Sequence, residues 1–477
     1  MSLFSERLKS VISKTGMPIY ALAKKAGVNR PMIHKSQQGD SIPSDEFIEK
    51  LSDAMMLTNL EKKELLSLAE RARMGEALYL KRQAVLNVLS CLCKEFDEMD
   101  LVALWKNKTP EHISGGYMFL KDCKQIEHVL LEMFQDKIHS AKEEKIYIYL
   151  PKHAKELFSI IYHLWSSNEA SHIQLTQFIG LEKEYHSDES AVHNLALISY
   201  ALNFCLMPEK SIKVRYYYLN YPENMDLPAM PYYIKTENDV LALSTDLNVG
   251  VYYSGGTMYD FYDQVIKTRL ENSKPLIESV ESTVQILDYK DPTHLIECIP
   301  CISAIVTDEM LDTFIRPEIP GRETLLNMLK SFYHEIQHNN KHPISFFQIK
   351  KLEKFMKDGI IPTVPSAWVR PAVPEERRKI AQSILNNMKN SKKRIYYAIN
   401  PEKLRILADA EVVLTEKDGV MIRHFVEDTA TLKIVWIRES SCIEAFSDFF
   451  NYLPGSNLVL SQDEMKKRVE ALLTDNR

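Results

Sequence analysis

The sequence has 477 residues, of which 45% are hydrophobic and 26% are charged, a composition that is ordinary for a globular protein of roughly two or three domains. No apolar run follows the opening MSLFSERLKS, and the most apolar long segment, residues 191–207, contains His193 and two asparagines and is too short to span a bilayer. Seven cysteines without a secretory signal indicate reduced thiols rather than a disulfide framework. We therefore expect a cytoplasmic protein without membrane contact.

The first predicted elements are short amphipathic helices. A helix is expected over residues 3–14, where apolar side chains fall on one face. Residues 19–39, IYALAKKAGVNRPMIHKSQQG, then read as two short helices joined by a tight turn. Leu22 lies on the inner face of the first helix, Gly27 makes the turn, and Ile33 inserts the second helix into the same small core.

This spacing is that of a helix-turn-helix, and about the first 70 residues resemble the Cro/repressor-type (Xre) family of DNA-binding domains. The residues that carry the resemblance are Leu22, Ala23, Gly27, Val28, Asn29, Ile33, Gly39 and Pro43. The resemblance implies a DNA-binding domain over residues 1–74 whose partner is a double-stranded DNA operator. The candidate DNA-binding residues, on and beside the outward face of the second helix, are Asn29, Arg30, Pro31, His34, Lys35 and Gln38. We also expect the Asn29 side chain to cap this helix, with Pro31 tolerated in its first turn.

The local charge agrees with a nucleic-acid partner. Residues 1–40 hold seven Lys and Arg against two acidic residues, a balance of +5, in a chain whose formal net charge is −6. A basic patch on an acidic protein indicates a confined polyanion site. The alternative is a protein-interaction scaffold in which the helix-turn-helix makes only protein contacts.

Two further helices complete this domain in the prediction. Ser44 is placed to cap the next helix, and Thr58 with Glu61 forms a capping box for the fifth. Residues 75–110 then read as a helical connector, with an apolar stripe that could also serve dimerisation.

Beyond the connector the hydrophobic period changes. β-rich runs at 145–150, 173–180 and 213–220 alternate with helical segments, which argues for a mostly parallel α/β sheet. We assign residues 111–310 to the first, sensor-like half of a large C-terminal α/β module.

The sequence contains a partial internal repeat. The run 232–255 and the helix after it are echoed by the strands within 411–437 and the helix that follows. The lead-in at 145–158 is likewise echoed at 394–407. We infer an unequal duplication whose second half covers residues 376–477.

Residues 311–375 separate the two halves as a helical insert and a Pro-rich loop. Residues 320–358 within this range are expected to be helical. The irregular segment that follows contains Pro362, Pro365, Pro371 and Pro374.

The order of helix, strand, hairpin and helix resembles a phospholipase-D-like half, whose catalytic H-x-K-x(4)-D would fall on YYIKTEND, residues 232–239. Neither copy has that His and Lys in place. The resemblance therefore implies the catalytically empty version that some transcription regulators use as a sensor, and no phosphodiesterase residue is carried over. A plain α/β effector domain is the alternative.

His334, Glu335 and His338 spell H-E-x-x-H, the pattern in which two imidazoles hold Zn²⁺ and the Glu acts as general base. Polar neighbours such as Gln337 and Asn339 instead indicate a solvated helical face. We expect no bound metal and no converging third ligand, and a DNA-binding zinc peptidase is the alternative.

Other chemistry-bearing patterns are weak. The sequence has no phosphate-binding glycine loop and no G-x-S-x-G, so no cofactor is expected. Cys298 and Cys301 form a C-x-x-C without a second pair, which favours packed thiols. A pocket for a small ligand could be lined by Tyr252, Tyr253, Tyr259 and Tyr262.

Together these patterns predict a non-enzymatic, sequence-specific transcription regulator. Its C-terminal module would sense an unknown small-molecule or peptide effector and form a homodimer.

Overall fold

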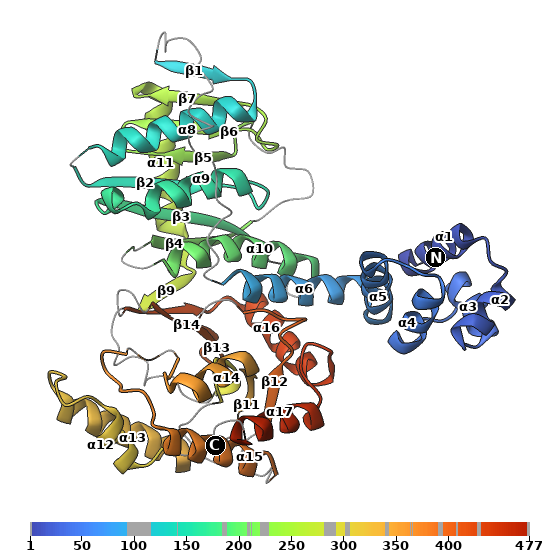
Figure 1. Cartoon of the computed structure of the whole chain (residues 1–477). Coiled ribbons are helices and arrows are strands. Elements are labelled where there is room, and N and C mark those ends of the chain that lie inside the picture. Colours follow the sequence, from blue (N-terminus) through green and yellow to red (C-terminus); the bar gives the residue numbers. More distant parts are fainter. Residues whose placement is uncertain are drawn as a thin grey trace. The chain divides into compact units, whose positions relative to one another are not determined.

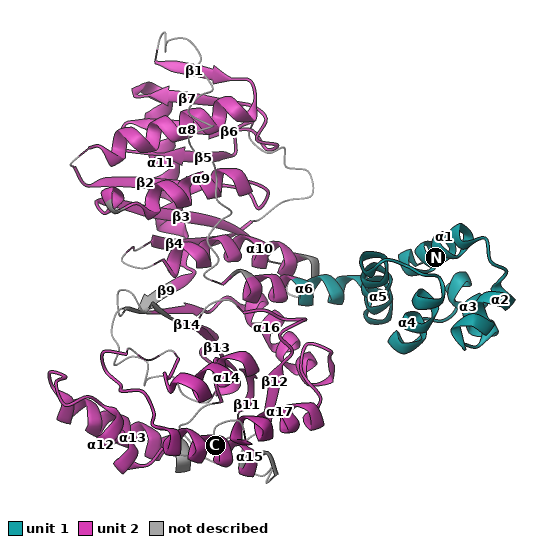
Figure 2. Ribbon diagram, viewed as in Figure 1, with its two compact units in different colours: residues 1–83 teal, residues 84–477 magenta. Residues whose placement is uncertain are grey.

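The computed structural model describes residues 2–92, 116–140, 142–183, 188–207, 210, 212–219, 229–280, 292–300, 306–338, 343–362, 364, 366–389, 395–406, 409–426 and 431–474. The chain forms two compact units, residues 1–83 and residues 84–477, which are coloured separately in Figure 2. Unit 1 is helical, and unit 2 is an α/β module with two mixed sheets (Figure 1). The predicted fold class is thereby confirmed.

Unit 1 is built on one small hydrophobic core. Its helices are α1 (Leu3–Thr15), α2 (Ile19–Ala26), α3 (Arg30–Gln38), α4 (Asp45–Ala54) and α5 (Asn59–Met74), and α6 (Glu76–Cys91) continues into unit 2. Phe4, Leu22, Ile33 and Leu65 are fully buried in the core of unit 1. The helices predicted for this region are therefore present.

The ends of these helices are fixed by local capping. Ser44 accepts a hydrogen bond from the Phe47 backbone N–H, and Thr58 forms the predicted capping box with Glu61. Gly27 ends α2 at a φ of 64°, in the left-handed region that favours glycine.

The predicted side-chain cap by Asn29 is wrong. Asn29 occupies the N-cap position of α3, but its side chain forms no capping hydrogen bond with this helix. An N-cap side chain bonds to the second or third N–H of its helix. The second position here is Pro31, which has no N–H, and the third N–H, that of Met32, donates to the Asn29 backbone carbonyl at 3.2 Å.

The first sheet of unit 2 has the strand order β1-β7-β6-β5-β2-β3-β4-β8. The strands in this order are β1 (Tyr117–Leu120), β7 (Gly250–Ser254), β6 (Asp239–Leu243), β5 (Tyr232–Lys235), β2 (Glu144–Tyr149), β3 (Ile173–Glu182), β4 (Ile212–Leu219) and β8 (Lys274–Pro275). Only β2, β3 and β4 run parallel, and the other neighbouring pairs are antiparallel. The expectation of a mostly parallel sheet is therefore wrong, because the strands β5, β6 and β7 extend the same sheet.

Helices cover both faces of this sheet. α8 (Cys123–Ile138), α9 (Lys155–Ser166) and α10 (Asp188–Cys205) share a core with one face, and the short helix η1 (Asn168–Ala170) follows α9. α11 (Gly256–Asn272) packs on the opposite face through Tyr262 and Ile266. We call this opposite side the α11 face.

The second sheet has the order β12-β11-β10-β13-β14-β15-β9. Its strands are β12 (Ile395–Ile399), β11 (Ile344–Gln348), β10 (Pro292–Glu297), β13 (Ala410–Thr415), β14 (Val420–Val426), β15 (Thr431–Ile437) and β9 (Ile277–Val280). Its helices are α12 (Asp308–Phe314), α13 (Arg322–His338), α14 (Ile349–Asp358), α15 (Pro374–Lys389), α16 (Ser440–Tyr452), η4 (Leu453–Gly455) and α17 (Gln462–Thr474). Here β10, β11 and β12 are the parallel strands.

The two sheets share one topology. In each, three parallel strands are followed by three antiparallel strands that pair along the other side of the first parallel strand. One more strand, β1 in the first sheet and β9 in the second, completes the antiparallel edge. This agreement supports the duplication inferred from the sequence.

The boundaries of the second copy differ from the sequence prediction. The match of 145–158 to 394–407 is wrong, because β2 is the first parallel strand of its sheet and β12 is the third. Continuous helix over 320–358 is also wrong, since β11 lies between α13 and α14. The run ISFFQ of β11 is short, apolar and followed directly by a helix, so its periodicity does not distinguish strand from helix.

A shared core and buried polar contacts join the two sheets. α10 packs against α16, and Asn194 on α10 donates from Nδ2 to Ser441 Oγ at 3.0 Å. The same amide donates to the Glu182 carbonyl at 3.1 Å, and its Oδ1 accepts from the Glu182 N–H at 2.9 Å. Tyr218 on β4 donates to the buried carboxylate of Glu439 at 3.0 Å.

Replacing Asn194 with Ala is expected to lower the free energy of unfolding of unit 2 by about 2–3 kcal/mol, because backbone groups of Glu182 would lose their buried partner. Asn203→Ala on the same helix is the matched control, since the buried Asn203 Oδ1 has no hydrogen-bond partner in the described part of the chain. Urea denaturation of the full chain measures both. Equal losses for the two variants would contradict the assigned role of Asn194.

Candidate nucleic-acid interface

The orientation of α3 follows from the burial of its inner face. Ile33 on α3 and Leu22 on α2 are each 0% exposed. Since residues three and four positions apart share a helix face, the positions between them turn toward solvent. Asn29, Arg30, Pro31, Lys35 and Gln38 are exposed, and His34 is half-buried.

The predicted DNA-binding residues therefore lie together on α3 and its N-cap. Arg30 Nε donates to His34 Nε2 at 3.4 Å, which places these two side chains on one stripe of the helix. This surface, which we call the α3 face, combines cations, an amide and an imidazole. Such groups can donate to phosphates and to base edges in the major groove.

The cations near the α3 face carry uncompensated charge. Within the described residues, the side chains of Lys24, Lys25, Arg30 and Lys35 form no ion pair with an acid. Elsewhere in unit 1 the pattern differs, because Arg7 pairs with Glu64 at 2.7 Å. The end of α2 and α3 together thus present a concentrated positive field.

One exposed aromatic residue of the helix-turn-helix was missed in the sequence analysis. Tyr20, at the start of α2, keeps 65% of its surface exposed and lies one turn before Lys24 on the same helix. The sequence did contain a signal for this exposure. Tyr20 lies two positions before the buried Leu22, which puts it on the opposite side of the helix. A tyrosine hydroxyl there can donate to a phosphate oxygen.

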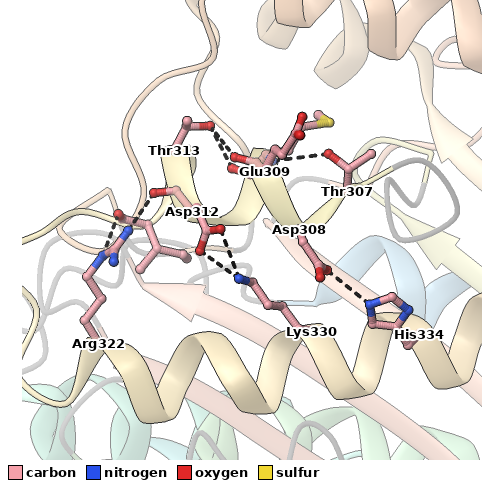
Figure 3. A network of polar contacts seen from close by, with 10 residues as sticks. Thr307, Asp308, Glu309, Asp312, Thr313, Arg322, Lys330 and His334 are labelled. Atoms are coloured by element: carbon pink, nitrogen blue, oxygen red, sulfur yellow. Dashed lines mark hydrogen bonds and ion pairs between the residues drawn. The ribbon is translucent and has the colours of Figure 1, made fainter.

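The H-E-x-x-H residues lie on α13, and Figure 3 shows how His334 points toward Asp308 on α12. His334 Nε2 lies 3.2 Å from Asp308 Oδ1, and both side chains are about half exposed. The expectation that no carboxylate approaches is therefore wrong for His334. Glu335 is exposed, and the side chain of His338 lies outside the described part of the structure.

Two polar side-chain contacts join α12 and α13. Lys330 on α13 binds Asp312 on α12 at 2.8 Å, one helical turn from the His334 pair (Figure 3). Among the residues that the structure describes, no three His, Cys, Asp or Glu side chains are grouped as a metal would require.

The four tyrosines proposed to line a pocket do not share one surface. Tyr252 and Tyr253 are neighbours on β7 and point to opposite faces of the sheet. Tyr252 donates to Asp239 at 2.8 Å, whereas Tyr253, Tyr259 and Tyr262 belong to the cluster on the α11 face. The predicted pocket is therefore wrong in its composition.

Cys298 is buried, and its burial raises the pKa of the thiol well above the ordinary range. This environment suits a packed thiol rather than a reactive one. Cys301, the second residue of the C-x-x-C, lies outside the described residues.

Comparison with protein-family models gives no match, and comparison with curated proteins gives none either. Among solved structures, TrmBL2, an archaeal chromatin protein described with a novel mode of DNA binding, is 11% identical with a TM-score of 0.22, over 58% of this chain and 94% of that one. Polyphosphate kinase from Porphyromonas gingivalis is 7% identical with a TM-score of 0.21, over 77% of this chain and 54% of that one. Both TM-scores are too low to indicate a shared fold, so neither likeness carries an argument.

The Cro/repressor-type resemblance thus depends on the sequence motif of unit 1 alone. Within the described residues, no helix is both long enough and apolar enough to cross a bilayer.

Purified chain, prepared without chelator, is expected to hold far less than one zinc per chain by elemental analysis. His334→Ala is expected to cost at most about 1 kcal/mol of stability, because its half-exposed ion pair with Asp308 is screened by solvent. Asp308→Asn is the matched variant from the other side of the pair. Stoichiometric zinc that disappears in His338→Ala would contradict this account.

Proposed function

We propose that this chain is a sequence-specific DNA-binding transcription regulator, in which unit 1 reads a double-stranded operator through α3. The observation that carries the proposal is the set of exposed cations on the end of α2 and on α3 that form no ion pair with any acid in the described residues. Several cations elsewhere in unit 1, such as Arg7, Lys50 and Lys62, pair with acids, whereas the described residues hold no such partner for these four side chains. The proposal assigns no catalytic activity to the chain.

The roles within the interface follow from side-chain chemistry. Arg30 can bond bidentately to guanine and Gln38 to adenine, the pairings that distinguish bases in the major groove. Lys24 and Lys25 extend from the last turn of α2, where they suit phosphate contacts that position the domain without reading sequence. Lys35 is exposed on α3, where it could contact either a base or a phosphate.

A regulator also needs a second copy and a signal. One helix-turn-helix reads a half-site, so we propose a homodimer held by residues beyond 76. Unit 2 then senses a small-molecule or peptide effector. An effector that binds one dimer arrangement better than another would change the spacing of the two α3 helices, and hence operator affinity.

Arg30→Ala and Lys35→Ala are each expected to weaken operator binding by about 1–3 kcal/mol if the side chain contacts a base. A residue that contacts phosphate instead should lower the slope of log affinity against log salt concentration by about one. Lys63→Ala removes an exposed cation from α5 and is the matched control. Fluorescence anisotropy over a salt series measures all three, and unchanged binding in both α3 variants would remove this surface from the interface.

Light scattering of the full chain bound to its operator should give a protein mass near twice the 55.2 kDa of one chain. The expected cause is pairing of two copies on a two-fold symmetric site. A protein mass near 55.2 kDa at micromolar concentration would contradict the proposed dimer.

A further inference from the structure

The α11 face of the first sheet carries an unusual group of side chains at one edge. Tyr149 is the last residue of β2, and Tyr217 lies near the end of β4. Tyr233 on β5 pairs with Tyr149 in the sheet register, so the two rings lie on the same face. The carboxyl ends of parallel strands are the edge at which open α/β sheets bind ligands.

A single guanidinium from α11 lies among these rings. Arg269 Cζ is 3.9 Å from the centre of the Tyr149 ring, 5.0 Å from that of Tyr233 and 5.3 Å from that of Tyr217. We call these four residues the Tyr–Arg cluster. The rings are packed against one another, with centres 5.9 Å apart for Tyr149 and Tyr233 and 6.0 Å apart for Tyr149 and Tyr217. Arg269 and Tyr217 are only half-buried, so the cluster reaches the surface.

Two polar atoms of the cluster lack a well-formed hydrogen bond. Arg269 Nη1 and Tyr233 Oη are buried on side chains that approach each other, and neither atom has a hydrogen-bond partner of good geometry within the described residues. No carboxylate in those residues pairs with Arg269. By contrast, Lys235 on the same face is neutralised by Asp263 at 3.2 Å. Buried donors and buried charge are normally satisfied, so this pattern indicates a site built for an acceptor.

Tyr233 and Tyr217 keep their protons at neutral pH, because burial raises the pKa of each hydroxyl. Burial raises the pKa of Tyr233 to about 12, with the Arg269 charge acting in the opposite direction. Burial likewise raises the pKa of Tyr217 far above its ordinary range. The cluster therefore offers neutral hydroxyl donors and one fixed positive charge, with aromatic walls around them.

The backbone beneath the cluster is adapted to this packing. A Cβ on Gly180 of β3 would lie 2.7 Å from Leu219 Cδ2 and 3.1 Å from the Tyr149 hydroxyl. A side chain at position 180 would therefore crowd Leu219 and the Tyr149 hydroxyl, and both would have to shift from their observed positions.

We propose that the Tyr–Arg cluster binds a small organic anion, a carboxylate or a phosphate monoester, whose oxygens accept from Arg269 Nη1 and Tyr233 Oη. The carbon skeleton of the ligand lies against the tyrosine rings. This inference rests on the proposed effector-sensing role of unit 2 and names its site and ligand class. It does not depend on DNA binding by unit 1.

Succinate, glycerol 3-phosphate and uncharged glycerol serve as probes at matched ionic strength without DNA. Thermal-denaturation midpoints of the full chain over a concentration series give an apparent Kd for each. At least one anion is expected to raise the midpoint in a saturable manner, and glycerol is not. The response to succinate against glycerol 3-phosphate shows which anion class the site takes.

Arg269→Gln is expected to weaken binding of the responding anion by about tenfold or more, because a charge-assisted hydrogen bond is lost. Lys267→Gln removes the same charge from an exposed position of α11 and should leave the Kd unchanged. Tyr233→Phe removes only a hydroxyl and is expected to weaken binding by about threefold to tenfold. This variant tests the proposed site if the Arg269 variant does not fold.

The proposal is overturned if neither anion raises the midpoint, if Tyr233→Phe binds as tightly as the unaltered chain, or if Lys267→Gln weakens binding as much as Arg269→Gln. A chain that responds to an anion through Arg269 but binds no DNA would refute the regulator proposal and leave this site standing.

Discussion

The insertion of Ile33 into the core of unit 1 is the constraint on which the rest of the account depends. Ile33 is 0% exposed and lies on the inner side of α3, a helix of nine residues. Only the opposite side of α3 can therefore face solvent. Gly27 lets the chain turn sharply enough for Leu22 and Ile33 to meet in one core. The position of Arg30 and Lys35 on the outer surface is therefore a consequence of packing.

Unit 2 obeys a different constraint, because two sheets of the same topology share one core. The contacts between them include polar groups that would be costly to bury alone, such as Asn194 and the Glu439 carboxylate. Groups of this kind fix geometry, since a displaced partner leaves a buried donor or acceptor unsatisfied.

Local signals in the sequence predicted unit 1 well. The capping box at Thr58, the glycine at position 27 and the 3.6-residue apolar period each act within a few residues, so they can be recognised without knowledge of tertiary contacts. The exception, Asn29, fails for reasons that are also local, because Pro31 lacks one N–H that a cap could use and the Met32 N–H donates to the Asn29 backbone carbonyl.

Unit 2 was harder to predict because its decisive contacts join distant residues. The strand ISFFQ reads equally well as buried helix until its two parallel neighbours are known. The approach of Asp308 to His334 depends on the packing of α12 on α13. The Tyr–Arg cluster brings together residues between 149 and 269, and no spacing within the sequence indicates it.

The most direct test of the central claim is selection of bound duplexes by the full chain from a random DNA pool at near-physiological salt. The account predicts enrichment of an inverted repeat whose half-sites have centres about one helical turn, or a multiple of it, apart. The same selection with the Arg30→Ala chain should lose preference at one position of each half-site. Recovery of DNA with no enriched sequence, or an identical enriched sequence from the Arg30→Ala and Lys35→Ala chains, would contradict sequence reading by α3.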